Sequence, residues 1–151
     1  MNQPTELIDH KRKMDIFESE VAKLPQVNLP LVHRFTDGMY IREIYMPAGT
    51  VVTSRTHKTQ HPFVVAQGVV DVIDEEGRIE RIMAPYLGIT QAGTRRVLRV
   101  LDDCVWITFH ATDKKDPVEI SNEITEGNND LLPDGFKQAY LGNKEDLWLL
   151  Q

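Results

Sequence analysis

The segment between Gly49 and Gly68 carries one arginine and two histidines at close spacing, Arg55, His57 and His61. Side chains alternate between the two faces of a strand, so Arg55 and His57 are expected on one side, with His61 entering the next strand there. Imidazoles bind transition metals or transfer protons near neutral pH. A guanidinium instead binds carboxylate or phosphate oxygens through paired hydrogen bonds. Metal or acid–base chemistry and anion binding are therefore both open at this segment.

A second set of functional side chains lies in the segment 104–110, which alternates in the same way. Its two faces carry Cys104, Trp106, Thr108 and His110 on one side and Val105, Ile107 and Phe109 on the other. Both faces contain apolar residues, so the alternation alone leaves open which one points inward. Cys104 is the single cysteine and most resembles a buried small hydrophobic residue. It lies about 20 Å along the strand from His110, too far for a nucleophile–base pair within that strand.

A further pair of arginines follows the turn at Ala92-Gly93. The alternation places Arg96 with Leu98 and Val100, and Arg95 on the opposite face with Val97. The alternative for both Arg55 and Arg96 is a structural ion pair at the barrel rim. The acidic candidates for such a pair are Glu43, Asp71 and Asp103.

Composition limits the classes of function. The 151 residues are 41% hydrophobic and 26% charged, as in an average globular domain, and the formal net charge is −6. An acidic chain argues against a broad basic surface that coats nucleic acid, although it permits a local basic pocket. Phosphate-loop, dinucleotide, serine-hydrolase and zinc-peptidase motifs are absent from the sequence. The charged N-terminus lacks the apolar core of a signal peptide, and no apolar run is long enough to span a membrane, so a cytoplasmic location is expected.

Short segments rich in valine, isoleucine, tyrosine and threonine alternate with turn signals from Asn28 to Thr112. The predicted strands are 31–36, 39–46, 50–56, 62–67, 69–74, 78–83, 86–90, 95–100 and 104–110. No segment between them is long enough for a crossover helix, so the pattern predicts an all-β sandwich or barrel.

Helices are predicted on either side of the barrel. Residues 5–24 carry an apolar stripe, with charged residues such as Glu18 expected on the solvated faces. The stripe consists of Met14, Phe17, Val21 and Leu24. A short helix is expected at 116–125, and the apolar residues of 126–151, including Trp148, favour packing on the barrel or on a partner subunit. The expected organisation is an N-terminal helix (1–27), a barrel (28–112) and a helical or irregular extension (113–151).

The spacing Gly49-x5-Arg55-x-His57-x3-His61-x6-Gly68 resembles the first motif of the cupin superfamily, Gly-x5-His-x-His-x3/4-Glu-x6-Gly. The second cupin motif, Pro-x-Gly-x2-His, aligns with residues 91–96. This resemblance covers residues 30–112 and implies a cupin-type double-stranded β-helix, a jelly-roll barrel. The chain is also similar to small single-domain cupin-like proteins common in phages and prophages. If it is phage-encoded, its compartment would be the host cytoplasm.

Departures from the cupin pattern bear on the chemistry. Arg55 and Arg96 stand where the resemblance implies histidine ligands, and His61 stands where it implies glutamate. Because arginine has only donors and a permanent charge, it cannot coordinate a metal and repels one nearby. A divalent metal could still be held by a reduced set, and its ligands would be His57, His61 and His110. The resemblance also favours the face of Trp106, Thr108 and His110 as the pocket wall.

Three functions therefore compete. The first is a binding protein whose cavity holds an anionic ligand, such as a nucleotide or phosphorylated metabolite, which a phage would use to sequester or sense a host signal. Its predicted ligand-binding residues are Arg55, His57, His61, Arg96, Trp106, Thr108 and His110, with Tyr40 or Tyr45 as possible neighbours. The second is an enzyme, either metal-dependent through the three histidines or a metal-free isomerase. The third is a structural or regulatory protein. A homodimer is expected, since the resemblance implies paired barrels.

Overall fold

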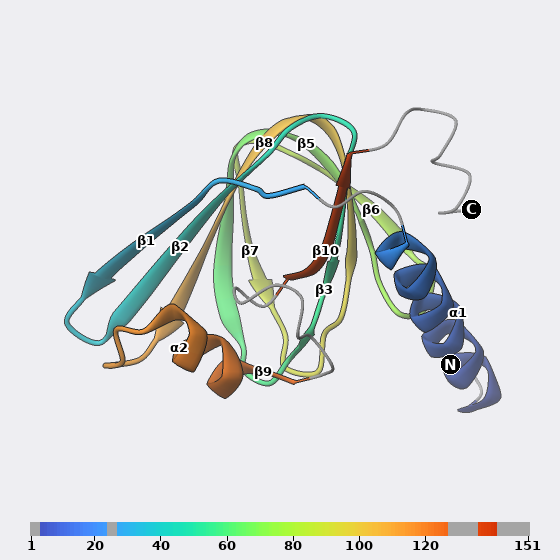
Figure 1. Ribbon diagram of the computed structural model, residues 1–151, viewed down its shortest axis with the longest axis horizontal. Coiled ribbons are helices and arrows are strands. Elements are labelled where there is room, and N and C mark those ends of the chain that lie inside the picture. The colour runs from blue at the N-terminus through green and yellow to red at the C-terminus, as the bar shows by residue number, and fades with distance from the viewer. Residues whose placement is uncertain (1–3, 24–26, 127–135, 142–151) are drawn as a thin grey trace.

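Figure 1 shows the computed structural model, a barrel of strands with one helix beside it and one at its lower end. The structure describes residues 4–23, 27–126 and 136–141. The helices are α1 (Pro4–Ala22) and α2 (Pro117–Ile124). The strands are β1 (Leu31–Thr36), β2 (Met39–Met46), β3 (Thr50–Ser54), β4 (Thr56–His57), β5 (His61–Ile73), β6 (Ile79–Met83), β7 (Tyr86–Thr90), β8 (Val97–Ala111), β9 (Thr125–Glu126) and β10 (Phe136–Leu141). The predicted all-β barrel is confirmed.

Strand β8 organises the sheet. Its C-terminal part pairs with β2 and its N-terminal part with β3, while β5 runs along its other side. The β5 strand in turn pairs with β6 and β7, and β10 pairs with β3. All these pairs are antiparallel. A separate two-stranded sheet joins β4 to β9, the short strand that follows α2.

Two predicted strand breaks do not exist. Segments 62–67 and 69–74 form the single strand β5, and segments 95–100 and 104–110 form the single strand β8. The pairing register shifts around Gly68, opposite Asp102 and Asp103, so both strands bend there without ending. Gly68 has φ +96°, and a Cβ placed on it would lie 2.3 Å from the Asp103 carbonyl oxygen. The residues that resemble turn signals therefore form a bulge between two long, bent strands.

An apolar cluster of the described residues fills the barrel interior. Its buried members are Ile44, Met46, Val52, Phe63, Val65, Val70, Val72, Ile82, Leu98, Val100, Cys104 and Trp106. Cys104 is fully buried, and desolvation raises the pKa of its thiol to about 11, so the expectation of a small hydrophobic residue is confirmed. Two members of the cluster, Leu98 and Trp106, also line the cavity described below.

Helix α1 packs on the outside of the sheet. Met14 and Phe17 contact Val51 and Val97 there, and Val21 is buried, as the apolar stripe predicts; Leu24 lies outside the described residues. Glu18 departs from the prediction of a solvated face, because it is buried and accepts a hydrogen bond from Arg95. Arg95, on the opposite face of the chain from Arg96 as expected, thus attaches helix α1 to the barrel through Glu18.

The C-terminal part is described in two pieces. Helix α2 begins after the N-cap Asp116, whose side chain accepts a hydrogen bond from the Val118 N–H at 3.0 Å, close to the predicted start. Strand β10 lies in the main sheet beside β3, whereas Trp148 and its neighbours lie outside the described residues. Among the described helices, none has the length and apolar character needed to cross a membrane.

Candidate functional site

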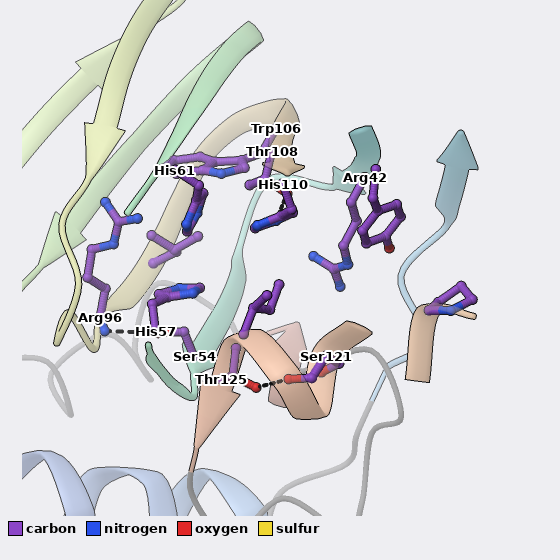
Figure 2. A pocket seen from close by; sticks show the side chains of 14 residues that line it. Arg42, Ser54, His57, His61, Arg96, Trp106, Thr108, His110, Ser121 and Thr125 are labelled. Atoms are coloured by element: carbon purple, nitrogen blue, oxygen red, sulfur yellow. Dashed lines mark hydrogen bonds between the residues drawn. The ribbon is translucent and has the colours of Figure 1, made fainter. Parts of the chain in front are cut away.

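A small cavity lies inside the barrel, between the inner faces of β2, β5 and β8 and the helix α2 (Figure 2). Its volume is about 50 Å³. Its lining consists of Tyr40, Arg42, Ser54, His57, His61, Arg96, Leu98, Trp106, Thr108, His110, Pro117, Ser121, Ile124 and Thr125. Six of the seven predicted ligand-binding residues belong to this set, and the inward face of β8 is the one that carries Trp106, Thr108 and His110.

Helix α2 closes one side of the cavity. Ile120 and Ser121 are buried, and the Thr125 hydroxyl donates to the Ser121 carbonyl at 2.6 Å where the helix ends. The chain then forms β9, which pairs with β4, so His57 lies directly opposite Thr125. A backbone hydrogen bond from the Lys58 N–H to the Ile124 carbonyl, 2.7 Å long, adds to this attachment. The helix is therefore held by the same short strand that carries His57.

Three histidines from different strands converge in the cavity. His57 lies on β4, His61 begins β5 and His110 is near the end of β8. The ring centroids of His57 and His61 are 4.8 Å apart, and those of His61 and His110 are 4.4 Å apart. Figure 2 shows the three rings facing the same space. The structure thus brings together the three histidines that the sequence analysis names as possible metal or anion ligands.

Burial keeps these imidazoles neutral. Desolvation, with smaller contributions from neighbouring histidines and arginines, lowers the pKa of His57 and of His110 to about 3. Desolvation also lowers the pKa of His61, although a hydrogen bond to the Thr59 carbonyl opposes the shift. At neutral pH each ring therefore carries one N–H donor and one acceptor nitrogen. The site presents polar atoms without adding charge from these side chains.

Several polar atoms of the cavity have no hydrogen-bond partner among the described residues. They are His57 Nδ1, His61 Nε2, His110 Nδ1 and Ser121 Oγ. The opposite nitrogens of two rings are engaged, because His61 Nδ1 lies 3.3 Å from the Thr59 carbonyl oxygen and His110 Nε2 lies 2.9 Å from Thr108 Oγ1. Buried polar atoms are normally satisfied, so unpartnered ones around a cavity indicate a place for water or a ligand.

Arg96 supplies a positive charge to this space. Its Nη2 donates to Thr90 Oγ1 at 2.5 Å, and its guanidinium carbon lies 5.3 Å from the Phe63 ring centroid and 5.6 Å from that of Trp106. Desolvation lowers the pKa of Arg96 to about 10, so it stays protonated at neutral pH. Its contacts are thus a hydroxyl and two aromatic faces, not the carboxylates considered for a rim ion pair. Asp71, one of those carboxylates, is bonded to Arg81 and Arg99 instead.

Arg42 is a cavity residue that the sequence reasoning missed. It is 7% exposed and lies in β2 opposite Thr108, while Tyr40 lies opposite His110. The signal was available in the alternation of β2, where Arg42 shares its face with Tyr40, Ile44 and Met46, all of them buried. A buried charged residue needs polar partners, so Arg42 on this face indicates a polar part of the interior.

Arg55 does not line the cavity, contrary to the prediction. Strand β3 ends at Ser54 and β4 begins at Thr56, so Arg55 falls between two strands. The alternation that would place it beside His57 is interrupted at that point. The cavity still has two arginines, but they are Arg42 and Arg96.

The residues present do not fit the metal centre that the cupin resemblance implies. Three imidazoles are suitable donors in type. Among the described residues, however, no group of three or more histidine, cysteine, aspartate or glutamate side chains is arranged to hold a metal ion together. Two guanidinium groups line the same cavity, and their charge opposes a cation. The lining therefore does not favour a metal centre.

Comparisons with known proteins support the fold. No protein-family model and no curated protein matches the sequence. Among solved structures, ectoine synthase from P. lautus is similar with a TM-score of 0.54 and 10% identity, over 76% of this chain and 78% of that one. An RmlC-like cupin family protein from Methanocaldococcus jannaschii is similar with a TM-score of 0.50 and 9% identity, over 57% of this chain and 82% of that one. A double-stranded β-helix protein from Klebsiella pneumoniae is similar with a TM-score of 0.50 and 14% identity, over 64% and 90% of the two chains. The chain has the double-stranded β-helix fold of the cupins.

Proposed function

We propose that this protein binds a small anionic molecule in the cavity of its barrel. The observation that carries the proposal is the lining itself: two arginines and three neutral histidines face one space that is closed by α2. Among the described residues, no carboxylate lines that space. An anion would accept charge-assisted hydrogen bonds from these guanidinium groups, and such bonds are stronger in a desolvated site.

The cavity volume favours the smallest members of the ligand class expected from the sequence. One water needs about 10 to 15 Å³ of such space, so 50 Å³ corresponds to roughly three to five water positions. Pockets for drug-sized ligands have volumes of about 300 to 1,000 Å³. A nucleotide would therefore require α2 to move away from the barrel. An inorganic oxyanion or a carboxylate of two or three carbons requires no such movement.

The proposal is tested by titrating inorganic phosphate into the purified protein and its arginine variants, with isothermal calorimetry. Arg96→Gln and Arg42→Gln each remove a charged donor from the cavity. Each should weaken binding by about 1.5 to 3 kcal/mol, or roughly 10- to 150-fold, as for hydrogen bonds to charged groups. Arg34→Gln is the matched control, because that side chain is 54% exposed on β1 and away from the cavity lining. Equal affinities in all four proteins would overturn the proposal.

We also propose that the expected homodimer forms through the edge made by β6 and β7. In the described part of the chain both strands pair only with β5, so their other side is open. The hydrogen bonds Asp74 N–H to Arg78 carbonyl and Ala84 N–H to Gly68 carbonyl show which residues of β6 face β5. Between them, the alternation turns the backbone groups of Ile79, Arg81 and Met83 towards the open side.

The side chains of this edge support a second copy of the chain as the occupant. Five of the nine exposed large hydrophobic residues in the described part lie on β6 and β7: Ile79, Met83, Tyr86, Leu87 and Ile89. Arg81 is paired within the subunit with Asp71, at 2.9 Å, a carboxylate that it shares with Arg99. Two such edges can pair antiparallel about a two-fold axis.

A further inference from the structure

One buried atom of the cavity, Nε2 of His61, has chemistry beyond that of the arginines. His61 is 3% exposed, and its Nδ1 lies 3.3 Å from the Thr59 carbonyl oxygen. A carbonyl oxygen can only accept a hydrogen bond, so Nδ1 carries the proton of this ring. In the neutral ring Nε2 is then an acceptor with no proton, and its tautomer is set by the backbone.

This acceptor lacks a partner within the described protein. His61 Nε2 is buried and has no hydrogen-bond partner among the described residues, and the ring lines the cavity. A buried acceptor left without a hydrogen bond loses the solvation that it has in water, which is unfavourable. An occupant of the cavity that carries its own O–H or N–H group would remove this cost, whereas an occupant with acceptors alone would not.

The neighbouring groups add to this requirement. The arginines are donors only, so they bind the anionic oxygens of an occupant. His61 Nε2 is an acceptor, so its hydrogen-bond partner on the same small molecule must be a donor. The 50 Å³ cavity has room for roughly three to five water positions, so one ligand of about five non-hydrogen atoms must supply both the anionic oxygens and the donor.

We infer that the cavity selects small anions that carry their own O–H group, and that His61 Nε2 is the atom that accepts a hydrogen bond from this group. The inference rests on the proposed anion-binding function and specifies its ligand class. Two kinds of molecule share this chemistry, the hydrogen phosphate ions and the short 2-hydroxycarboxylates. Sulfate and acetate are their counterparts without the O–H group at neutral pH.

The test compares four probes by isothermal calorimetry at pH 7: phosphate with sulfate, and glycolate with acetate. We expect the protein to bind phosphate or glycolate more tightly than its counterpart by about 3- to 10-fold, the range of one hydrogen bond. The two pairs distinguish an oxyanion from a hydroxy acid as the preferred source of the O–H group. A ratio near one in both pairs would overturn the inference while leaving the anion site intact. Failure of all four probes to bind would overturn the proposed function itself.

Two substitutions of His61 assign the preference to its ring. His61→Phe keeps an aromatic ring but removes the acceptor, so the ratio within each pair should fall to about one, with sulfate and acetate bound as before. His61→Gln places an amide oxygen near the position of Nε2 and should restore part of the preference. Thermal unfolding of each variant verifies that it is folded. An unchanged affinity ratio in folded His61→Phe would show that another group accepts the hydrogen bond from the O–H group.

Discussion

Acidification should destabilise this protein well above the pH range in which carboxylates titrate. The physical cause is the burial of His57 and His110, whose pKa is lowered to about 3 in the folded chain by desolvation. In the unfolded chain both imidazoles recover a pKa near 6.5 and take up protons below it. The unfolded state therefore binds more protons between pH 6.5 and pH 3, so the free energy of unfolding falls as the pH falls through that window.

The magnitude follows from the two pKa values. At pH 5 each histidine lowers the free energy of unfolding by on the order of 2 kcal/mol relative to pH 8, and the pair lowers it by on the order of 4 kcal/mol. His61 adds to the effect with the same sign, since its pKa is also lowered. Asp71 does not contribute in this range, because its pKa is lowered from 3.8 by the hydrogen bond to Arg81, so its contribution is lost only at more acidic pH.

Urea unfolding followed by circular dichroism at pH 8, 6.5 and 5 measures this dependence. His110→Gln removes one titrating group, so about half of the loss from this pair between pH 8 and pH 5 should disappear, whatever the variant's stability at pH 8. A free energy of unfolding that is constant from pH 8 to pH 5 would refute the reasoning. A slope that is unchanged in His110→Gln would refute the assignment to that residue.

Two further predictions concern the strand bulge and the open edge. Gly68→Ala should lower the free energy of unfolding by about 1 to 3 kcal/mol, because its φ is +96° and the new Cβ would meet the Asp103 carbonyl oxygen. The control Gly38→Ala, with φ +77° and no atom nearer than 3.9 Å, should lower it less in the same urea measurement. Equal losses in the two variants would contradict the close approach at Gly68. Leu87→Asp, at a residue 70% exposed on β7, should convert a dimer into a monomer in light scattering. The control Ile16→Asp, at a residue 54% exposed on α1, should leave the dimer intact. A monomeric wild-type protein would refute the interface at the β6–β7 edge.

The barrel was predictable because period-two alternation and turn residues carry direct information about strands. Strands β1, β2 and β7 have the predicted bounds. The errors arise at Gly68 and at Asp102-Asp103, which have the composition of turns but meet each other across the sheet. A sequence pattern describes one segment at a time, so it cannot show that two such segments are opposite each other and form a bulge.

The site was predictable in its histidines and only half predictable in its arginines. Spacing and resemblance led to His57, His61 and Arg96, which do line the cavity, and also to Arg55, which does not. The inward position of Arg42 could have been predicted from the alternation of β2, although Arg42 belongs to no motif. The contributions of α2, such as Ser121, depend on how a helix outside the motifs folds back on the barrel, and only tertiary structure reveals that placement.

The central claim is that an anion occupies the cavity beside the histidines, and ¹⁵N NMR of the imidazole nitrogens tests it most directly. Long-range proton–nitrogen spectra at pH 7 should show His61 as a neutral ring with a protonated Nδ1 and an unprotonated Nε2. Saturating phosphate should shift the ring signals of His57, His61 and His110, and Arg96→Gln should require a higher phosphate concentration for the same shifts. Ring signals that do not move at any phosphate concentration would contradict the account.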